Sequence, residues 1–330
     1  MAANRTYTIT EESIDSITGL WQDSANHLKW NCLFVLPGWL KAWWQAFGGE
    51  RIPYLCSIRS RGELIGMAPL MFEGRTARLM GDTDVCDFLD VVLVPGREKA
   101  FFDALFDHLK KQGIRQLDLE AVRSDSTLYR HLAPATTDQP YAVDCRSVDA
   151  TMVLDLPASW DAYLLQLTGK QRHEVRRKFR RLEEAGRVAL RTVDNAAEVS
   201  SQMGTFLTLF KKNRSEKAQF MTEQRASFFN ALAIELASAR ILKLYFLMLN
   251  DTVVAAVMCF DHDDTFHLYN NGYHEKYHSL SVGLLSKLFT VKERIRLGKK
   301  RYDFLKGTEV YKHRLGGRQV PLYHCRVQFD

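Results

Sequence analysis

Hydrophobic and polar positions change their period several times along the chain, and each change marks a predicted element. In the segment 37–47, four aromatic residues recur at the spacing of one helical face. A proline opens the segment and a Gly-Gly pair follows it, which are start and stop signals for a helix. The pattern predicts an amphipathic helix whose aromatic stripe packs in a core, with the lining of a ligand cavity as the alternative.

The rest of the first half alternates strand-like and helix-like segments. The runs 54–60 and 63–72 surround an Arg-Gly turn and predict a β-hairpin. Residues 97–113 carry apolar side chains at helical spacing and end on a glycine, which predicts a helix. Three further segments have the length and apolar content of strands: 77–81, 87–94 and 114–122.

The second half repeats this order. In each half, the glycine that ends the long helix precedes an aspartate of the next strand by five residues: Gly113 and Asp118 in the first half, Gly298 and Asp303 in the second. This repetition predicts an internal duplication with too long a period for a solenoid. The second copy comprises a hairpin of 241–249 and 252–260, a strand at 265–273, a helix at 281–298 and a strand at 300–305.

The length agrees with two domains, because 330 residues exceed what one hydrophobic core usually organises. We expect an α/β (α+β) fold with two tandem domains, residues 1–150 and 151–330, each with a mixed, mainly antiparallel sheet flanked by helices. The composition, 46% hydrophobic and 25% charged, is typical of a folded globular protein.

Two features bear on where the protein works. The start of the chain lacks a signal sequence, and no apolar run is long enough to span a bilayer. The six cysteines stand far apart and include no C-x-x-C pair, so we expect six reduced thiols. Together these features indicate a cytoplasmic protein without a membrane span.

Positive charge is concentrated in two segments. Residues 170–181 carry seven cations and one acid, a local net charge of +6, and residues 292–318 carry +7. The first segment has a narrow apolar stripe and a threonine cap, which predicts a basic helix over 169–185. We expect it to bind phosphate groups, with a merely solvated surface as the alternative. The candidate phosphate-binding residues are Lys170, Arg172, Arg176 and Arg177.

Four segments, in this order, resemble those of one enzyme family: LPGWLKAWWQAFG, GKQRHEVRRKFRRLEEAG, SLSVGLL and YDFLKGTEVYKHRLGG. They resemble the GNAT-superfamily N-acyltransferases of the cellulose-biosynthesis (CelD-like) type, which are related to the Fem-type transferases that build peptidoglycan cross-bridges. The closing D-F-L-x-G-x-x-x-Y-K is the most specific part. The resemblance implies two GNAT-like domains and transfer of an acyl group from acyl-CoA or acetyl-CoA, as co-substrate, to an amine. The acceptor would be a small-molecule or nucleotide-linked precursor, for example in polysaccharide biosynthesis.

The closing segment, in which the glycines predict a loop around Tyr311 and Lys312, then supplies the candidate catalytic residues. Acyl transfer to an amine requires a positioned donor, a stabilised oxyanion and a path for the ammonium proton. Asp303 is expected to orient the amine or pass on its proton, and Tyr311 to hydrogen-bond the leaving thiolate. Lys312 is expected to stabilise the oxyanion or bind a phosphate. The structural alternatives are a turn cap for Asp303, ring packing for Tyr311 and a surface cation for Lys312.

The donor loop departs from the family pattern. The usual motif, (Arg or Gln)-x-x-Gly-x-(Gly or Ala), maps onto residues 280–285, where only Gly283 matches. Backbone N–H groups at a helix start still bind phosphate, and Ser279 and Ser281 add donors. We therefore expect these three residues to bind the donor, with simple capping and close packing as the alternative.

Two further interpretations of the chain stay open. A Fem-like enzyme would take its acyl group from aminoacyl-tRNA, and a non-catalytic module would only bind a phosphorylated ligand. No metal is expected, because the spacings of His262, His267, His274 and His278 match no usual zinc pattern. A G-x-S-x-G elbow and a phosphate-binding P-loop motif are both missing from the sequence. The oligomeric state is left undetermined.

Overall fold

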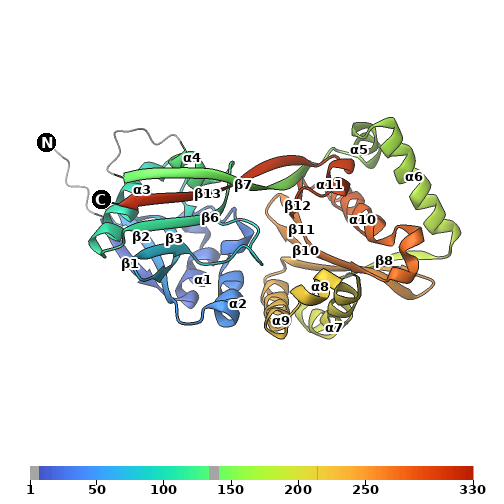
Figure 1. Cartoon of the computed structure of the whole chain (residues 1–330), viewed down its shortest axis with the longest axis horizontal. Coiled ribbons are helices and arrows are strands. Elements are labelled where there is room, and N and C mark those ends of the chain that lie inside the picture. The colour runs from blue at the N-terminus through green and yellow to red at the C-terminus, as the bar shows by residue number, and fades with distance from the viewer. Residues whose placement is uncertain (1–6, 134–140, 214, 330) are drawn as a thin grey trace. The chain divides into compact units, whose positions relative to one another are not determined.

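The computed structural model describes residues 7–133, 141–213 and 215–329. The chain divides into two compact units, whose elements are labelled in Figure 1. Unit 1 comprises Met1–Ala150 and Val320–Asp330, and unit 2 comprises Thr151–Gln319. Each unit is built around a mixed sheet with helices packed on it. The predicted α/β (α+β) class is therefore confirmed.

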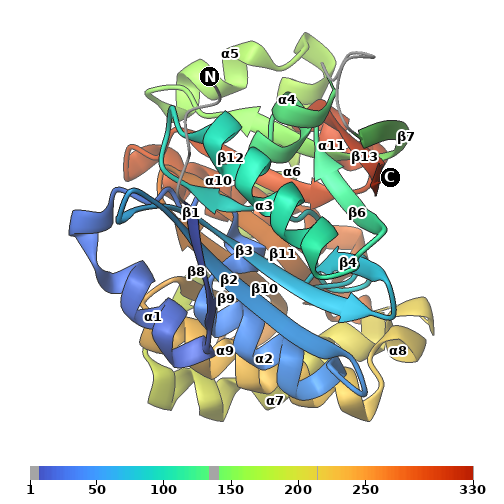
Figure 2. The ribbon, with the colours of Figure 1, turned by 90° about the vertical axis from the view of Figure 1, so that its left-hand side faces the viewer.

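Unit 1 contains most of the first half of the chain and its last strand. Its elements are β1 (Tyr7–Glu12), α1 (Ile14–Gln22), α2 (Pro37–Phe47), β2 (Ile52–Ser60), β3 (Glu63–Glu73), β4 (Thr76–Leu79), β5 (Val92–Leu93), α3 (Glu98–Lys111), β6 (Gln116–Arg123), α4 (Thr127–Leu132) and β13 (Arg318–Phe329). The main sheet runs β1-β2-β3-β4-β6-β13, and β5 pairs with β3. Helix α3 lies along the sheet (Figure 2), and a Cβ atom at Gly66 of β3 would collide with the ring of Phe101. The glycine therefore lets this helix approach the strand closely.

Unit 2 follows the same plan, with three helices, α7 to α9, between its first short strand β8 and its central hairpin. Strand β7 (Tyr141–Asp155) begins in unit 1, and its last residues pair with β12. The remaining elements are α5 (Trp160–Gln166), α6 (Gly169–Glu184), β8 (Val188–Val193), α7 (Ala196–Asn213), α8 (Ser215–Phe220), α9 (Glu223–Ser238), β9 (Leu242–Leu249), β10 (Thr252–His262), β11 (Thr265–Tyr273), α10 (Val282–Arg296), β12 (Arg301–Lys306) and α11 (Val310–Arg314), with a short 3₁₀ helix, η3 (Glu275–Leu280), before α10. The strands run β12-β11-β10-β9-β8.

The two units repeat one order of elements, as the sequence predicted. In unit 1, β4, α3 and β6 follow one another as β11, α10 and β12 do in unit 2. In unit 1, β4 pairs with β6, and in unit 2, β11 pairs with β12. Each of these ladders is parallel and spans three residue pairs. The ladder of unit 1 ends at Arg78 and Asp118, and that of unit 2 ends at His267 and Asp303. The two aspartates whose spacing indicated the repeat therefore hold equivalent places.

Three local expectations differ from the structure. The second domain was expected to extend to residue 330, but β13 pairs with β6, so Val320–Asp330 belong to unit 1. Of the strand expected at 87–94, only Val92–Leu93 pairs, because the preceding residues form a buried loop. The loop expected around Tyr311 and Lys312 contains the short helix α11.

The expectation of six reduced thiols is wrong at one pair. Cys145 of β7 and Cys325 of β13 form a disulfide across a sequence separation of 180 residues. The four other cysteines are buried free thiols. Their burial raises the pKa of Cys32 and of Cys56 to about 12, so these thiols stay protonated. Within the described residues, no helix has the length and apolar character needed to cross a membrane.

Candidate functional site

The candidate donor site lies at the start of α10 in unit 2. Ser281 precedes the helix in the left-handed region, with φ of +57°, and its side chain does not cap the first turn. The Ser281 Oγ instead accepts a hydrogen bond from Lys178 of α6 at 2.7 Å. The first turn of α10 also presents backbone N–H groups without intrahelical acceptors. This arrangement fits a phosphate group, since N–H dipoles and a lysine converge on one place.

The other two predicted donor residues lie beside this turn. Ser279 is exposed in η3, whereas Gly283 is buried in the first turn of α10. A Cβ atom at Gly283 would come within 2.5 Å of the ring of Tyr273. Gly283 therefore allows Tyr273 to pack against the helix, as its structural alternative required. Contact with a donor stays a prediction for all three residues.

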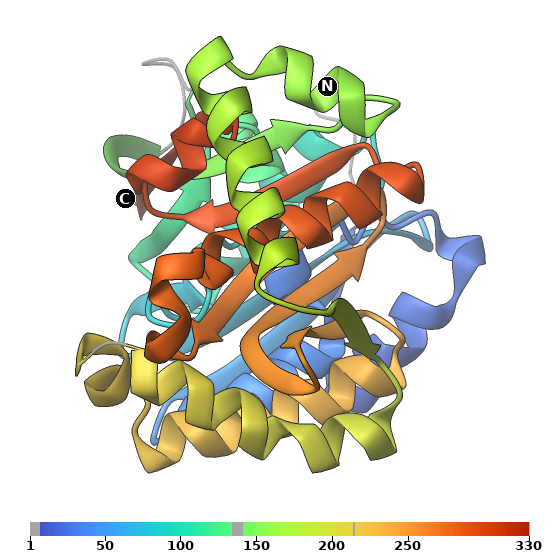
Figure 3. The ribbon, with the colours of Figure 1, turned by 90° about the vertical axis from the view of Figure 1, so that its right-hand side faces the viewer.

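Helix α6 brings the basic segment to this site. Figure 3 shows α6 crossing over α10, and the ring of Phe179 meets that of Phe289 at 4.9 Å. Thr168 caps α6 through a capping box, as predicted, and the helix ends at Glu184. Of the four candidate phosphate ligands, Lys170 and Arg176 are exposed, whereas Arg172 and Arg177 are partly buried. The structure thus places the basic helix and the start of α10 together.

Two of the candidate cations already have protein partners. Arg177 forms an ion pair with Glu174 at 2.8 Å, and Arg172 donates to the Leu164 carbonyl. Lys178, which the sequence analysis did not select, is the cation that reaches α10. Its position in the basic run was visible in the sequence, but which face of α6 meets α10 was not. Its other partner is Glu174, at 3.1 Å.

Asp303 lies at the last pair of the ladder between β11 and β12. It is fully buried, and its Oδ1 accepts the backbone N–H of Leu305 at 2.8 Å. Leu305 has φ of +61°, an unusual value for a branched residue, and the pairing register of β12 with β7 shifts at this place. Asp303 therefore supports a kink in the strand, which is the turn-capping alternative. Its role in chemistry stays a prediction.

His267 is the cross-strand neighbour of Asp303, and the sequence analysis did not connect the two residues. It is 3% exposed and pairs with Asp303 in the parallel register of β11 and β12. The sequence signal was only its membership in a group of four histidines. Strand register, which places it beside Asp303, cannot be read from that spacing.

Lys312 is a buried lysine rather than a surface cation. Its Nζ donates to the carbonyls of Leu305, Lys306 and Gly307 at 3.3, 2.5 and 3.1 Å, and it pairs with Glu309 at 2.9 Å. These contacts tie α11 to the loop that follows β12. A lysine with four partners positions this loop, and its proposed contact with an oxyanion or a phosphate is untested.

Tyr311 is a residue of α11 and packs against the core of unit 2. Burial raises the pKa of its hydroxyl above the ordinary value, and the Glu309 carboxylate raises this pKa further. Its ring packs against the core cluster, and the Nζ of Lys287 lies 4.8 Å from the ring centroid. Tyr311 is therefore protonated at neutral pH and able to donate a hydrogen bond.

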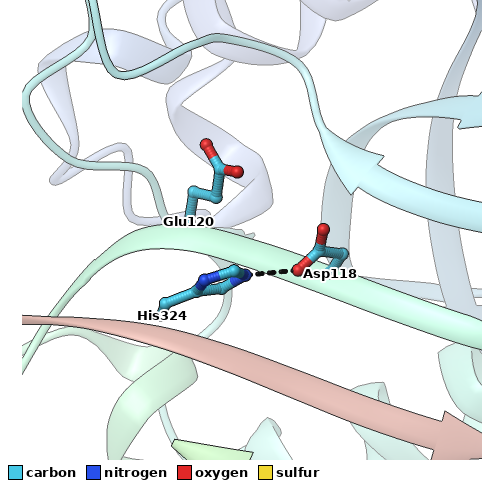
Figure 4. Close-up of side chains that lie close together, drawn as sticks. All are labelled: Asp118, Glu120 and His324. Atoms are coloured by element: carbon cyan, nitrogen blue, oxygen red, sulfur yellow. Dashed lines mark hydrogen bonds and ion pairs between the residues drawn. The ribbon is translucent and has the colours of Figure 1, made fainter. Parts of the chain in front are cut away.

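Unit 1 holds a different group of charges at the equivalent ladder end. Figure 4 shows His324 of β13 bound to Asp118 of β6 at 2.5 Å, with Glu120 nearby. Within the described part of the chain, these three residues are the group whose atoms lie close enough to hold a metal ion. Arg78 already pairs with Asp118 at 2.9 Å and with Glu120 at 3.4 Å. A divalent cation would have to displace this guanidinium, so we interpret the group as an ionic network between strands.

The connection after β4 also differs from its counterpart after β11. It carries four aspartates between residues 82 and 90, a stretch that contains no lysine or arginine. Its apolar residues are buried, among them Val85 and Phe88. Asp82 accepts the indole N–H of Trp43 at 2.7 Å. In unit 1, the place equivalent to the candidate phosphate site is therefore acidic and lined by a packed loop.

Comparisons with known proteins relate the fold to known domains. Residues 169–313, which run from α6 to α11, match the family model of an acetyltransferase (GNAT) domain. A search of the curated proteins finds no match. Among solved structures, the chain is similar to FemX with a TM-score of 0.65 and 12% identity, over 98% of this chain and 97% of that chain.

Two further solved structures share the fold. They are the C-terminal domain of a provisionally assigned lysylphosphatidylglycerol synthetase from Agrobacterium fabrum (TM-score 0.57, 12% identity, 85% and 84% of the two chains) and L-PGS from Bacillus licheniformis (TM-score 0.54, 10% identity, 88% and 90%). At these identities the likeness concerns the fold alone. The cellulose-biosynthesis type stays a prediction from the sequence. By the family match, residues 169–313 are similar to a GNAT-type acetyltransferase domain.

Proposed function

We propose that the protein is an N-acyltransferase whose donor site lies in unit 2. The donor is acyl-CoA or acetyl-CoA, and the acceptor is an amine of a small-molecule or nucleotide-linked precursor, for example in polysaccharide biosynthesis. One observation carries the proposal: Lys178 of the basic helix meets Ser281 at the first turn of α10. A pyrophosphate at this turn would accept hydrogen bonds from the backbone N–H groups, and the cations of α6 would attract its negative charge.

The residues of unit 2 suit transfer by positioning. A thioester already has a good leaving group, so holding donor and amine together supplies much of the rate. Tyr311 would donate its hydroxyl hydrogen bond to the departing sulfur. Lys312 would keep the loop after β12 in place through its three carbonyl contacts. Asp303 would support the end of the ladder, and we retain its role in orienting the amine as part of the proposal.

The contrast between the units favours unit 2 as the donor half. The connection between β11 and α10 includes Ser281 and lies beside α6. The connection between β4 and α3 carries four aspartates and buried apolar side chains. Phosphate groups would be repelled there by the carboxylates.

The first test is a thermal-shift screen against CoA, acetyl-CoA and longer acyl-CoAs. A ligand at a hundred times its Kd stabilises a protein by about 2.7 kcal/mol, which such a screen detects. We expect a rise in Tm for the protein and a smaller rise for Lys178→Met at the same ligand concentration. An equal rise in both would contradict the assigned site. Absence of any shift would contradict an acyl-CoA donor.

A second candidate function is transfer from aminoacyl-tRNA. Lys170, Arg176, Arg180 and Arg181 are exposed along α6, and this line of cations exceeds what one pyrophosphate requires. An RNA backbone would use it, and affinity would then fall steeply with salt. Filter binding of tRNA at several salt concentrations distinguishes the two donors. A protein that binds phosphorylated ligands but transfers no acyl group from either donor would instead be a binding module.

A further inference from the structure

Lys287 is a buried cation of unit 2 to which no role has been given so far. It lies on α10 one turn after Gly283, and only 6% of it is exposed. Its Nζ donates to the Gly283 carbonyl at 2.7 Å. The same Nζ lies 4.8 Å from the centroid of the Tyr311 ring. Lys287 therefore links the first turn of α10 to a candidate catalytic residue.

An apolar side chain would fill this place at lower cost. Burying an ammonium group carries a large desolvation penalty, and the neighbours on α10, such as Leu288 and Val291, are apolar. A cation within about 6 Å of an aromatic centroid is attracted to the ring face, more strongly where water is excluded. The contact fixes the ring and places a positive charge beside the phenol.

The groups around the Tyr311 hydroxyl oppose one another. Burial and the carboxylate of Glu309 both raise the pKa of Tyr311. Lys312 pairs with Glu309, and its positive charge partly offsets the effect of this carboxylate on Tyr311. The hydroxyl of Tyr302, which stays neutral in the core, is another titratable neighbour. Lys287 is the cation over the ring, and its charge favours the phenolate form.

We propose that Lys287 is a positioning residue for Tyr311, which it holds by its ring and makes a better proton donor. The proposal rests on the proposed acyl transfer. When the tetrahedral adduct collapses, the C–S bond breaks and its electron pair goes to sulfur. The sulfur takes the Tyr311 hydroxyl proton, and the phenolate then regains a proton from the nitrogen of the new amide. Lys287 stabilises the phenolate between these two transfers.

The test compares variants of Lys287 with a matched lysine on the same helix. Lys287→Met keeps the size of the side chain and removes its charge, whereas Lys287→Arg keeps the charge. Lys292→Met is the control, because Lys292 also lies over an aromatic ring, that of Trp160 at 5.8 Å, but is exposed. We expect Lys287→Met to lower kcat about tenfold with little change in the KM for donor, and Lys287→Arg to lower it less than threefold.

A spectroscopic measurement separates this role from a merely structural one. A trifluorotyrosine encoded at position 311 has a more acidic phenol than tyrosine, which brings its titration to a lower pH despite burial, and ¹⁹F NMR follows it directly. We expect Lys287→Met to raise the pKa of this phenol by about one unit and Lys292→Met to leave it unchanged. In the Tyr311→Phe background, the further loss of kcat caused by Lys287→Met should disappear.

Each outcome bears on the proposal. An unchanged phenol pKa in Lys287→Met overturns it, as does an equal loss of kcat in Lys287→Met and Lys287→Arg. If Lys287→Met does not fold, Lys287→Gln takes its place in both measurements. If the protein transfers no acyl group to any amine, the proposed function fails. The phenol pKa then still decides whether Lys287 acts on Tyr311.

Discussion

The two units end their parallel ladders in different ways. In unit 1, Asp118 meets Arg78 across the ladder and also binds His324. In unit 2, Asp303 lies opposite His267, and its carboxylate accepts a hydrogen bond from the backbone N–H of Leu305. One repeated scaffold thus carries an ionic network in one copy and a strand kink in the other. The comparison teaches that the two copies share a backbone arrangement, whereas the polar side chains at equivalent positions make different interactions.

The connections that follow β4 and β11 extend this difference. In unit 1 the chain between β4 and α3 is acidic and packed, and in unit 2 the chain between β11 and α10 meets the basic helix α6. Phosphate binding is therefore expected in only one copy. The following changes test this division, from the largest expected effect to the smallest.

Lys312→Met should have the largest effect, because it removes the cation that organises the end of β12. Three carbonyls lose a charged donor, and since each acceptor left without a partner costs about 1–3 kcal/mol, the total loss should be about 3–5 kcal/mol. Urea unfolding would measure this loss in the free energy of unfolding. Glu309→Gln is the control and should cost under about 1 kcal/mol, because Glu309 is exposed. A stable Lys312→Met protein without turnover would instead make Lys312 a catalytic residue.

Replacing each of the two equivalent aspartates with Asn should have opposite effects on stability and turnover. Asp118→Asn loses the charge that faces Arg78 and His324, so we expect a loss of about 2–3 kcal/mol in stability with turnover retained. Asp303→Asn keeps an oxygen for the Leu305 N–H, so its stability loss should stay below about 1 kcal/mol. If Asp303 acts on the amine, turnover falls at least about tenfold. Matching losses of stability in both variants would remove the distinction between the units.

Asp90 in the packed loop of unit 1 should make stability depend on pH. Its burial raises its pKa to about 6, although the N–H groups of Thr127, Val91 and Leu128 oppose the shift. The folded state therefore holds the proton more tightly than the unfolded state, where the pKa is about 3.9. The stabilisation is complete below about pH 4 and is lost as the pH rises through 6, by roughly 3 kcal/mol. Urea unfolding at several pH values should show this slope and its loss in Asp90→Asn.

Charge removal near α10 should affect donor binding alone. Lys178→Met should weaken CoA binding about tenfold, the size of one charge-assisted hydrogen bond. Lys99→Met on α3, the counterpart helix of unit 1, should leave CoA binding unchanged, because Lys99 is exposed and pairs with Asp103 of its own helix. Isothermal titration of CoA into both variants measures this. Similar losses in both would mean that net charge, rather than a site, attracts the ligand.

Local patterns in the sequence predicted much of the fold. The aromatic helix at 37–47, both hairpins and both long helices are present, because each has a clear period and its own stop signal. Residues 87–91 resemble the start of a strand in the sequence but form a buried loop, since short apolar runs look alike in strands and packed loops. Cys145 and Cys325 were not paired, because spacing in the sequence carries no information about register between distant strands.

The candidate site was predicted unevenly for the same reason. Thr168 as the cap of α6 and the basic face of that helix followed from local pattern. The burial of Lys312 among carbonyls did not, because a lysine in a glycine-rich segment normally lies at the surface. Lys178, His267 and Lys287 owe their positions to contacts between elements far apart in the chain. No periodicity within one segment specifies such contacts.

The return of β13 to unit 1 has a consequence for biosynthesis. Its partner β6 ends at Arg123, whereas β13 begins at Arg318. The sheet of unit 1 therefore stays incomplete during synthesis until β13 has been made. A ribosome adds about 5–20 residues per second, so β6 and β7 spend on the order of 10–30 s without this neighbour. Unit 2 is complete by then, and the nascent chain must shield an open sheet edge in the meantime. Synthesis of the last dozen residues therefore acts as the closing step of folding for the first half of the protein.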